Sequence, residues 1–409
     1  MHILFLTDNF PPEVNAPASR TFEHAREWVK QGHRVTIITC APNFPKGKVI
    51  EGYKNRPWQT EDIDGIRVVR VWSYITGNQG FAKRILDYQS YMVTSFLASF
   101  FVRRVDVVVG TSPQFFTACA AWAAAAIKRK PFIFELRDIW PESIRAVGAM
   151  NQSKVLDAFE RIELFLYHRA KIIISVTNSF KDNLVRRGID GEKIHVVTNG
   201  VDTTRFSPKP KDAELEAELG LKGKFVAGYI GTHGMAHALE TLVDAARLLE
   251  KNVGTHDIRI LMLGDGANRD DVMDAAQGLS NIVFLESVSK DEVSRYWSLL
   301  DLSIIHLKKS DLFKTVIPSK MFECMGMGIP IVHGVEGESA DIVTRYKVGV
   351  TFEPENAEAL STALVNLKSN PELRNELCRN GLRGATSFDR RNLANDMLEI
   401  FKTASKMNS

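Results

Sequence analysis

The stretch FVAGYIGTHG, residues 225–234, joins an apolar run of strand type to a turn bounded by two glycines. A segment with apolar residues at helical spacing follows, from about Ala236 to Lys251. A second apolar run, Ile258–Leu263, comes next and ends in Gly264-Asp265-Gly266. Because parallel strands need a crossover between them, this succession predicts a βαβ unit with both glycine turns at the same edge of the sheet.

The same alternation continues in both directions and restarts once, near residues 198–211. The strands expected before the restart span residues 2–7, 34–39, 66–71, 106–110, 132–136, 172–176 and 194–197, and those expected after it span residues 225–230, 258–263, 282–285, 302–306, 329–333 and 349–352. At the restart Asn199-Gly200 predicts a turn, and Pro208 and Pro210 interrupt any helix or strand there. A chain of 409 residues is also too long for one ordinary hydrophobic core. We therefore expect two Rossmann-like α/β domains, residues 1–200 and 201–385, each with a parallel sheet.

The composition is that of a soluble globular chain, with 44% hydrophobic and 25% charged residues. No apolar run reaches the ~18 residues of a membrane span, and the apolar start, Met1–Thr7, lacks the basic flank and cleavage site of a signal peptide. The four cysteines are scattered, as is usual in a reducing cytosol, so we expect a cytoplasmic location. Residues 1–200 carry 27 Lys and Arg against 19 Asp and Glu. This excess of positive charge favours binding of phosphates or of an anionic membrane surface; the alternative is an ordinary solvated surface.

The two glycine turns are candidate phosphate sites. Glycine after a strand and before a helix lets backbone N–H groups approach an anion at the positive end of the helix. The residues expected to bind a donor phosphate are Gly231, Thr232, His233, Gly234, Gly264 and Gly266. The simpler alternative is that each glycine only serves a tight turn between strand and helix, and the sequence leaves this alternative open.

The segment IPSKMFECMGMGIP, residues 317–330, is the most specific of the chain. Ser319 is placed to cap a short helix that Gly328 closes. Lys320 and Glu323 are three positions apart and share one face of that helix. A carboxylate there can accept both hydroxyls of a ribose while an ammonium neutralises a diphosphate. The alternative is a surface ion pair of little energetic value.

Together these features resemble the retaining family-4 glycosyltransferases of the GT-B fold, over nearly the whole chain. The motifs that carry the resemblance are Asn199-Gly200-Val201-Asp202 with Phe206 and Pro208, Gly264-Asp265-Gly266, and Ser319-Lys320-Met321-Phe322-Glu323 with Gly328-Ile329-Pro330. The resemblance implies two Rossmann-like domains facing a central cleft, with the nucleotide sugar bound mainly by residues 201–385 and the acceptor by residues 1–200. It also implies that Glu323 holds the ribose and that a last helix, residues 386–409, crosses back to the first domain.

The sequence departs from the family's pattern in two respects. The family places a second glutamate eight residues before the ribose glutamate, where this chain has Thr315. The family's basic pair beside the diphosphate is replaced by Thr232 and His237, so Lys320 and Lys314 are the candidates for the missing positive charge. These departures resemble a branch of bacterial transferases for O-antigen and capsule polysaccharides, including those that transfer fucosamine-type sugars.

The resemblance to this branch also implies the substrates. The expected donor is a nucleoside diphosphate sugar, with UDP the commoner family choice and an N-acetylated amino or deoxy sugar attached. The expected acceptor is a hydroxyl of a lipid-linked saccharide. We expect neither a tightly bound metal nor nucleic acid as a partner, since no HExxH-like spacing, GxSxG elbow or Walker loop occurs. Two other functions stay open: a UDP-sugar 2-epimerase of the same architecture, and a non-catalytic nucleotide-sugar-binding protein.

The first domain offers candidates at two strand ends. The loop after the first strand places Asn15 and Ala16 where the family has glycines, and Arg20 is expected to start the next helix near an anionic acceptor. A purely structural turn is the alternative. The fifth expected strand ends in Arg137 and Asp138, where family members carry a histidine and an acid. A carboxylate there can orient a sugar hydroxyl or act as a general base, so we assign both residues a catalytic role; the alternative is a buried Arg–Asp pair.

An apolar stretch with basic ends, residues 83–104, is the last candidate. Lys83-Arg84 stand before the run YMVTSFLASFFV, and Arg103-Arg104 follow it. The run is too short to span a bilayer, but it can lie in the interface on the inner face of the membrane and meet a lipid-linked acceptor. The alternative is a well-buried helix of the first domain.

Overall fold

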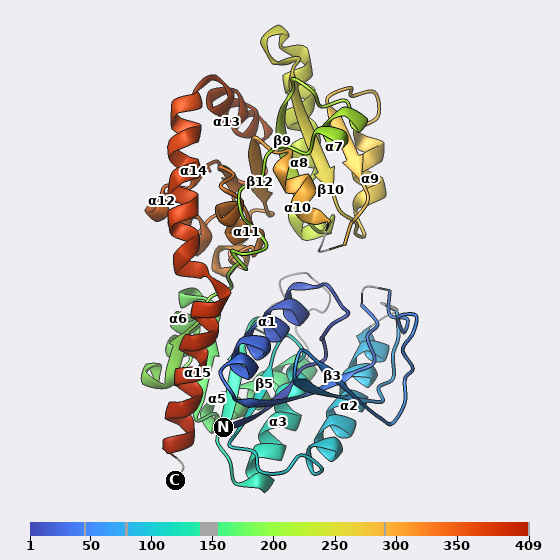
Figure 1. Ribbon diagram of the computed structural model, residues 1–409, viewed down its shortest axis with the longest axis vertical. Helices are drawn as coiled ribbons and strands as arrows, with labels where there is room; N and C mark the ends of the chain where they lie inside the picture. Colours follow the sequence, from blue (N-terminus) through green and yellow to red (C-terminus); the bar gives the residue numbers. More distant parts are fainter. Residues whose placement is uncertain (45, 78–80, 140–153, 290–291, 408–409) are drawn as a thin grey trace. The chain divides into compact units, whose positions relative to one another are not determined.

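The computed structural model describes residues 1–44, 46–77, 81–139, 154–289 and 292–407, and the chain forms two compact units (Figure 1). The first unit comprises Met1–Thr198 together with Arg390–Ser409, and the second comprises Asn199–Asp389. Each unit is built on one sheet whose strands are all or nearly all parallel, with helices on both faces. The predicted α/β class with two parallel-sheet domains is therefore confirmed.

The first unit holds an eight-stranded sheet in the order β3-β4-β2-β1-β5-β6-β7-β8. The strands are β1 (His2–Leu6), β2 (Arg34–Cys40), β3 (Trp58–Ile63), β4 (Ile66–Val71), β5 (Val107–Thr111), β6 (Phe132–Leu136), β7 (Ile172–Ser175) and β8 (Ile194–Val196). All neighbours are parallel except β3, which pairs antiparallel with β4. Since β1 lies between β2 and β5, the strand order reverses there, and the carboxyl ends of these three strands form the edge where such sheets usually bind ligands.

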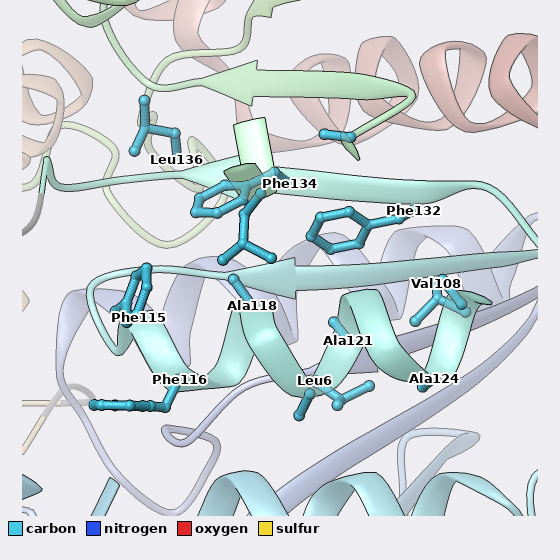
Figure 2. Packing of buried hydrophobic residues seen from close by; sticks show 14 of the residues in the cluster. Leu6, Val108, Phe115, Phe116, Ala118, Ala121, Ala124, Phe132, Phe134 and Leu136 are labelled. Atoms are coloured by element: carbon cyan, nitrogen blue, oxygen red, sulfur yellow. The ribbon is translucent and has the colours of Figure 1, made fainter. Parts of the chain in front are cut away.

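Helices cover both faces of this sheet. One face packs on α1 (Ala16–Lys30) and α15 (Arg390–Lys406), and the other on α2 (Phe81–Ser99), α3 (Phe115–Lys128), α5 (Lys154–Arg169) and α6 (Asn178–Arg186). Figure 2 shows the small side chains of α3, among them Ala118, Ala121 and Ala124, facing the strands. A Cβ at Gly110 would lie 2.5 Å from that of Ala121, so this close approach of helix and sheet requires a glycine in β5.

The last helix belongs to the first unit because it supplies part of that unit's core. Trp28 of α1 is fully buried, donates from Nε1 to the Ala394 carbonyl at 2.8 Å, and contacts the ring of Phe401 edge-on at 5.1 Å between centroids. An ion pair between Arg390 and Glu23 adds a second link between α15 and α1. Residues about 370 positions apart in the chain are thus packed together by apolar burial.

The second unit holds a six-stranded, fully parallel sheet in the order β11-β10-β9-β12-β13-β14. The strands are β9 (Phe225–Ile230), β10 (Ile258–Leu263), β11 (Ile282–Leu285), β12 (Leu302–His306), β13 (Ile331–Gly334) and β14 (Gly349–Thr351). The helices are α7 (Ala213–Glu218), α8 (Glu240–Lys251), α9 (Arg269–Ala275), α10 (Val293–Ser298), α11 (Lys320–Met327), α12 (Glu338–Tyr346), α13 (Ala357–Ser369) and α14 (Pro371–Ala385). One face packs on α8, α9 and α13, and the other on α10, α11 and α12.

The edge strand β3 was missed from the sequence. Its side chains alternate between exposed and half-buried, so it has no apolar run. The signal that could have found it is the pair Asp64-Gly65, which joins β3 to β4 with φ of +52° and +81°. Asp-Gly with both residues in the left-handed region is the preferred two-residue hairpin turn.

Candidate functional site

In the second unit, the predicted donor-binding residues gather where β9 ends, around the ring of Tyr229. The Nζ atom of Lys320 lies 3.6 Å from the centroid of that ring, and the rings of His233 and His237 lie 5.8 and 5.9 Å from it. The Tyr229 hydroxyl donates to the Thr232 carbonyl at 2.8 Å, which fixes the ring against the first glycine turn. Residues from β9, the turn after it and α11 therefore meet at one place.

The ammonium of Lys320 is buried without a hydrogen-bond partner among the described residues. It lies against the bare α-carbon of Gly231, where a Cβ would be 2.7 Å from Nζ, and Gly231 has φ +148°. A side chain at position 231 would therefore both strain the backbone and displace the ammonium. Burial lowers the pKa of Lys320 to about 8, although the negative charge of Glu323 acts to raise it. The group is therefore still mainly a cation at neutral pH.

The two histidines at this site are neutral. Neither ring nitrogen of His233 has a hydrogen-bond partner among the described residues, and nor does Nδ1 of His237. Burial lowers the pKa of His233 to about 4 and that of His237 to about 3, and the Lys320 charge acts in the same direction. The site thus offers one buried ammonium and several unused ring nitrogens, an arrangement that an anion would complete.

The two glycine turns pack directly on each other. A Cβ at Gly264 would lie 1.8 Å from the Gly231 carbonyl oxygen, and one at Gly266 would lie 2.5 Å from the His233 carbonyl oxygen. Backbone bonds join the turns, from His233 N–H to the Asp265 carbonyl and from Asn268 N–H to the His233 carbonyl, both at 2.9 Å. This packing accounts for Gly264 and Gly266 without a ligand, as the simpler interpretation of the sequence had it.

One local prediction for this region was wrong, and another was confirmed in position only. The helix expected from Ala236 begins at Glu240, because Met235–His237 form a separate 3-10 turn and Ala238 adopts a left-handed conformation with φ +42°. Ser319 stands at the N-cap of α11 but has helical angles and makes no side-chain capping bond. The sequence patterns therefore predicted the start of α8 too early, and they predicted a capping bond that α11 lacks.

Lys314 does not supply the missing charge that we expected of it. Its ammonium is exposed and forms ion pairs with Asp311 at 2.8 Å and with Glu336 at 3.6 Å. Two carboxylates thus neutralise it at the surface. Glu323, the predicted ribose ligand, lies half-buried in the first turn of α11, close enough for its charge to act on Lys320.

Two members of the site were missed from the sequence, Tyr229 and Arg269. Tyr229 is a strand residue whose apolar neighbours hid it in the pattern of a core strand. Arg269 begins α9, its Nε is buried without a partner among the described residues, and its charge contributes to the lowered pKa of His233. The sequence signal for Arg269 was its place at the start of a helix, three positions after Gly264-Asp265-Gly266.

The first unit contains a cavity of about 590 Å³ beside the carboxyl ends of β1, β2 and β5. It is lined by Asp8, Asn9, Glu13, Asn15, Pro17, Cys40, Asn43, Phe44, Gly47, Thr76, Gly77, Arg84, Asp87, Tyr88, Tyr91, Pro113 and Gln114. Three carboxyls and one guanidinium are thus set among amides and aromatic rings. Burial raises the pKa of Asp8, Glu13 and Asp87, that of Asp87 to about 7.

Glu13 is the most constrained of the lining carboxyls. It is 5% exposed, and its Oε1 accepts from the backbone N–H groups of Asn43 at 2.8 Å and Phe44 at 2.9 Å. Its Oε2 is buried without a hydrogen-bond partner among the described residues. The aromatic and amide lining around such acceptors is typical of a site for a hydroxyl-rich ligand.

Asn15 lines this cavity and also has a structural task. Its Oδ1 caps α1 by accepting from Ala18 N–H at 2.8 Å, and its Nδ2 donates to Asn9 Oδ1 at 2.6 Å. Ala16 is the first residue of α1. The loop therefore has the structural role that we left open, and it also brings Asn15 to the cavity.

Arg20 does not start a helix near an acceptor, as we had expected. It lies inside α1, is 2% exposed, and binds Glu135 of β6 through Nε at 2.9 Å. Its other nitrogens donate to the carbonyls of Thr198 at 2.6 Å and Val197 at 2.9 Å. Burial disfavours the ionised Glu135, but the charges of Arg20 and Arg137 outweigh it and hold its pKa below the usual value. Arg20 is thus a buried structural residue of the first unit.

The predicted catalytic pair follows β6. The backbone N–H groups of Arg137 and Asp138 both donate to Ser112 Oγ, at 2.8 and 3.1 Å. Arg137 Nη1 is 3.4 Å from the Pro17 carbonyl, and burial lowers the pKa of the guanidinium to about 10 despite the opposing charge of Glu135. Both side chains are half-buried. The rest of the loop that we singled out, residues 140–142, lies outside the described residues.

Within the ranges that the structure describes, no helix is long and apolar enough to cross a membrane.

Comparisons with known proteins agree with the architecture. The family model described as Glycosyltransferase Family 4 matches residues 18–205, and the model described as Glycosyl transferases group 1 matches residues 224–370. The putative colanic acid biosynthesis glycosyl transferase WcaI of Escherichia coli K12 is 26% identical over 377 residues, which cover 88% of this chain and 90% of WcaI. The putative teichuronic acid biosynthesis glycosyltransferase TuaH of Bacillus subtilis is 27% identical over 207 residues, 49% of each chain.

Among solved structures, Anabaena HepE in complex with UDP superposes with a TM-score of 0.74. The likeness covers 98% of this chain and 100% of HepE, at 16% sequence identity. At that identity the likeness shows a common fold.

Proposed function

Since this chain belongs to the family-4 glycosyltransferases of the GT-B fold, we propose that it transfers a sugar from a UDP-sugar to a hydroxyl group of a lipid-linked saccharide. The sugar would be an N-acetylated amino or deoxy sugar, transferred with retention of its anomeric configuration. The names of WcaI and TuaH connect them with colanic acid and teichuronic acid, so we propose that the reaction belongs to the synthesis of a bacterial surface polysaccharide. HepE, which shares the fold, is described with UDP, which supports uridine as the donor base.

The observation that supports the donor site best is the buried ammonium of Lys320, which has no hydrogen-bond partner in the part of the chain that the structure describes. A buried charge with no partner costs free energy, and a protein keeps such a group where a ligand of opposite charge completes it. The diphosphate of a nucleotide sugar is such a ligand, and its charge grows when the glycosidic bond breaks. A fixed ammonium in a site shielded from water stabilises that leaving group without reorganisation in the transition state.

We assign the remaining donor contacts to residues around Lys320. The Gly231 N–H already donates to the Leu263 carbonyl at 2.9 Å, so the diphosphate would accept from the backbone N–H groups of Thr232 and Gly234, and Glu323 would accept the ribose hydroxyls. Arg269 joins them as a second cation. The missing positive charge would thus come from Lys320, as the sequence predicted, together with Arg269 in place of Lys314.

The acceptor would bind in the 590 Å³ cavity of the first unit. Its carboxyls and amides can hold sugar hydroxyls, and its aromatic rings can pack on the apolar face of a sugar ring. Asn15 would contact the acceptor from the cavity wall, with Ala16 behind it at the start of α1. Arg137 and Asp138 would act at the neighbouring strand end, Asp138 by orienting a reacting hydroxyl. Arg20 has no part in acceptor binding.

The test is to incubate the protein with UDP- and GDP-linked hexoses, N-acetylhexosamines and deoxy sugars, together with a lipid extract that contains acceptors. Mass spectrometry then shows whether a lipid-linked saccharide gains the mass of one sugar. Conversion of a donor alone into an epimer would instead identify an isomerase. Tight UDP binding with neither reaction, across the whole panel, would identify a nucleotide-sugar-binding protein and overturn the proposal.

The ribose assignment predicts that Glu323→Ala lowers the affinity for UDP by ~1–3 kcal/mol, or about 5- to 150-fold, because the ribose hydroxyls lose their acceptor. Isothermal titration calorimetry measures this change directly. The control is 2′,3′-dideoxy-UDP, which lacks both hydroxyls and should bind the wild type and the variant equally. An equal loss with both nucleotides would place Glu323 away from the ribose.

The pKa of Lys320 predicts how UDP affinity depends on pH. An anion raises the pKa of the ammonium above its free value of about 8, so binding favours the protonated form. The contribution of Lys320 to the affinity should therefore be level below pH 7 and fall by about fivefold between pH 8 and pH 9, as the protonated fraction falls from about a half to about a tenth. A Lys320→Met variant provides the control, because any ionisation of the nucleotide itself is common to both proteins. The same slope in both proteins would show that Lys320 does not contact the diphosphate.

A further inference from the structure

Helix α2 of the first unit carries an apolar stripe on the side that faces away from the core. Five large apolar side chains on or directly after α2 are exposed: Leu86 at 50%, Val93 at 50%, Leu97 at 52%, Phe100 at 46% and Phe101 at 69%. The spacings of seven and four residues keep Leu86, Val93 and Leu97 along one side of α2, and Phe100 and Phe101 follow directly after its last residue, Ser99. Single exposed apolar residues are ordinary, but a group of them marks a surface that contacts something apolar.

Aromatic side chains from the neighbouring strands extend this stripe. Trp58 of β3, 38% exposed, contacts the Phe101 ring edge-on at 5.5 Å between centroids. Trp72, 40% exposed, lies beside α2, because its carbonyl accepts from Thr94 Oγ1 at 2.8 Å. Figure 1 shows β3 and α2 in the same part of the first unit. Tryptophan at the border of an apolar surface is typical of proteins that sit in the interface of a bilayer.

A basic hollow of about 470 Å³ adjoins the end of the stripe. It is lined by Phe100, Val102, Arg103, Arg104, Val105, Asp106, Lys128 and Lys130. The Asp106 carboxylate accepts from the backbone N–H of His2 at 2.7 Å, and Lys128 donates to the Val102 carbonyl at 2.8 Å. The side chains of Arg103, Arg104 and Lys130 are exposed and leave the hollow strongly positive.

We propose that this surface, formed by the α2 stripe, Trp58, Trp72 and the basic hollow, docks the first unit on an anionic lipid bilayer, with phosphate headgroups in the hollow. Phe100 lines the hollow and is also part of the stripe, so one residue joins the apolar and the basic contact. A bilayer with anionic headgroups matches this surface, because an apolar stripe borders directly on exposed basic side chains. The excess of basic residues in the first half of the chain acts in the same direction.

The same helix connects this surface with the acceptor cavity. Arg84, Asp87, Tyr88 and Tyr91 of α2 line the 590 Å³ cavity, whereas Leu86, Val93 and Leu97 are exposed. One helix therefore separates the cavity from the proposed bilayer surface. This step rests on the proposed function: a saccharide anchored to a lipid in the bilayer would need to reach only across α2 to enter the cavity.

Vesicle co-sedimentation of the full chain tests the docking without any glycosyl transfer. The wild type should bind vesicles of phosphatidylglycerol and phosphatidylcholine and not those of phosphatidylcholine alone. Reversing three charges, with Arg103→Glu, Arg104→Glu and Lys130→Glu, should weaken this binding by roughly a hundredfold or more. A matched control reverses three exposed lysines of the second unit, Lys222, Lys251 and Lys347, and should bind as the wild type does.

The apolar contact has its own variant, Phe100→Ser with Phe101→Ser, which should weaken vesicle binding by about tenfold or more. Phe96 stays unchanged because it is half-buried against the core. The control is Val185→Ser, since Val185 is 45% exposed on α6, away from α2.

Thermal unfolding and UDP binding should match the wild type in every variant, so a failure of docking is distinguishable from a failure of the transferase proposal. Unchanged vesicle binding in both surface variants would overturn the docking. The docking would also be overturned if the wild type did not bind vesicles and instead formed dimers through this surface.

Discussion

Lys320→Met is expected to raise the thermal unfolding midpoint of the nucleotide-free protein while lowering its affinity for UDP by about 10- to 150-fold. Methionine has a similar shape and removes a buried ammonium that has no hydrogen-bond partner among the described residues, a desolvation cost of ~1–3 kcal/mol. The lost contact of Nζ with the Tyr229 ring, 3.6 Å from its centroid, offsets part of this gain. The affinity falls because a charge-assisted hydrogen bond to a diphosphate contributes ~1.5–3 kcal/mol.

The stability gain of this variant should depend on pH. The pKa of Lys320 is lowered to about 8 in the folded protein, so between pH 8 and about 10.5 the unfolded chain binds more protons than the folded one. The wild type therefore recovers stability as the pH rises through this range, and the advantage of Lys320→Met should shrink. Unfolding midpoints at pH 7 and pH 9.5 measure the difference.

Lys314→Met is the matched control for this experiment. Lys314 is exposed and paired with Asp311 and Glu336, so its replacement should change neither the midpoint nor the UDP affinity appreciably. A loss of UDP affinity in Lys314→Met with none in Lys320→Met would reverse the assignment of the two lysines. Destabilisation of the free protein by Lys320→Met would mean that the ammonium already has a partner.

Arg20→Met is expected to lower the unfolding midpoint by the equivalent of ~3–5 kcal/mol, because it leaves Glu135 as a buried carboxylate without its main counter-charge. It also removes the donors to the Thr198 and Val197 carbonyls. Thermal unfolding of the variant measures the loss. Arg34→Met is the control, since Arg34 is exposed on β2 and its replacement should shift the midpoint very little.

Two further variants keep this prediction testable when Arg20→Met does not fold. Glu135→Gln removes the charge of the partner and should destabilise less, since the amide oxygen can still accept from Arg20. In the double variant Arg20→Met with Glu135→Gln, the cost should be smaller than the sum of the single costs, because the two side chains are coupled. If Arg20→Met had a normal unfolding midpoint and a raised KM for the acceptor, Arg20 would be a residue of the acceptor site.

Much of the fold could be predicted because its signals are local. Strand bounds such as Phe225–Ile230 and Ile258–Leu263 coincide with apolar runs, and α5 spans the segment that was expected from helical spacing, Lys154–Arg169. The exceptions are local as well. The strand β3 has no apolar run, and the helix after Gly234 begins late because Ala238 takes a left-handed conformation.

The candidate site was harder to predict because charge and burial depend on distant neighbours. Lys320 and Lys314 are six positions apart and look equivalent in the sequence, yet one ammonium is buried beside Tyr229 and the other is neutralised at the surface. Likewise Asp87 of α2 and Asp8, which follows β1, line the same cavity although they are far apart in the sequence. No local pattern contains such pairings.

The sequence by itself determined the two parallel α/β sheets, the positions of the glycine turns and the motif around Glu323, since apolar periodicity and glycine are written residue by residue along the chain. Only the tertiary structure decided that Arg20 is a structural residue and that the Lys320 ammonium is buried without a hydrogen-bond partner among the described residues. The physical reason is that the free energy of a charged group depends on which groups surround it after folding, and Arg20 meets its partner Glu135 from 115 positions away.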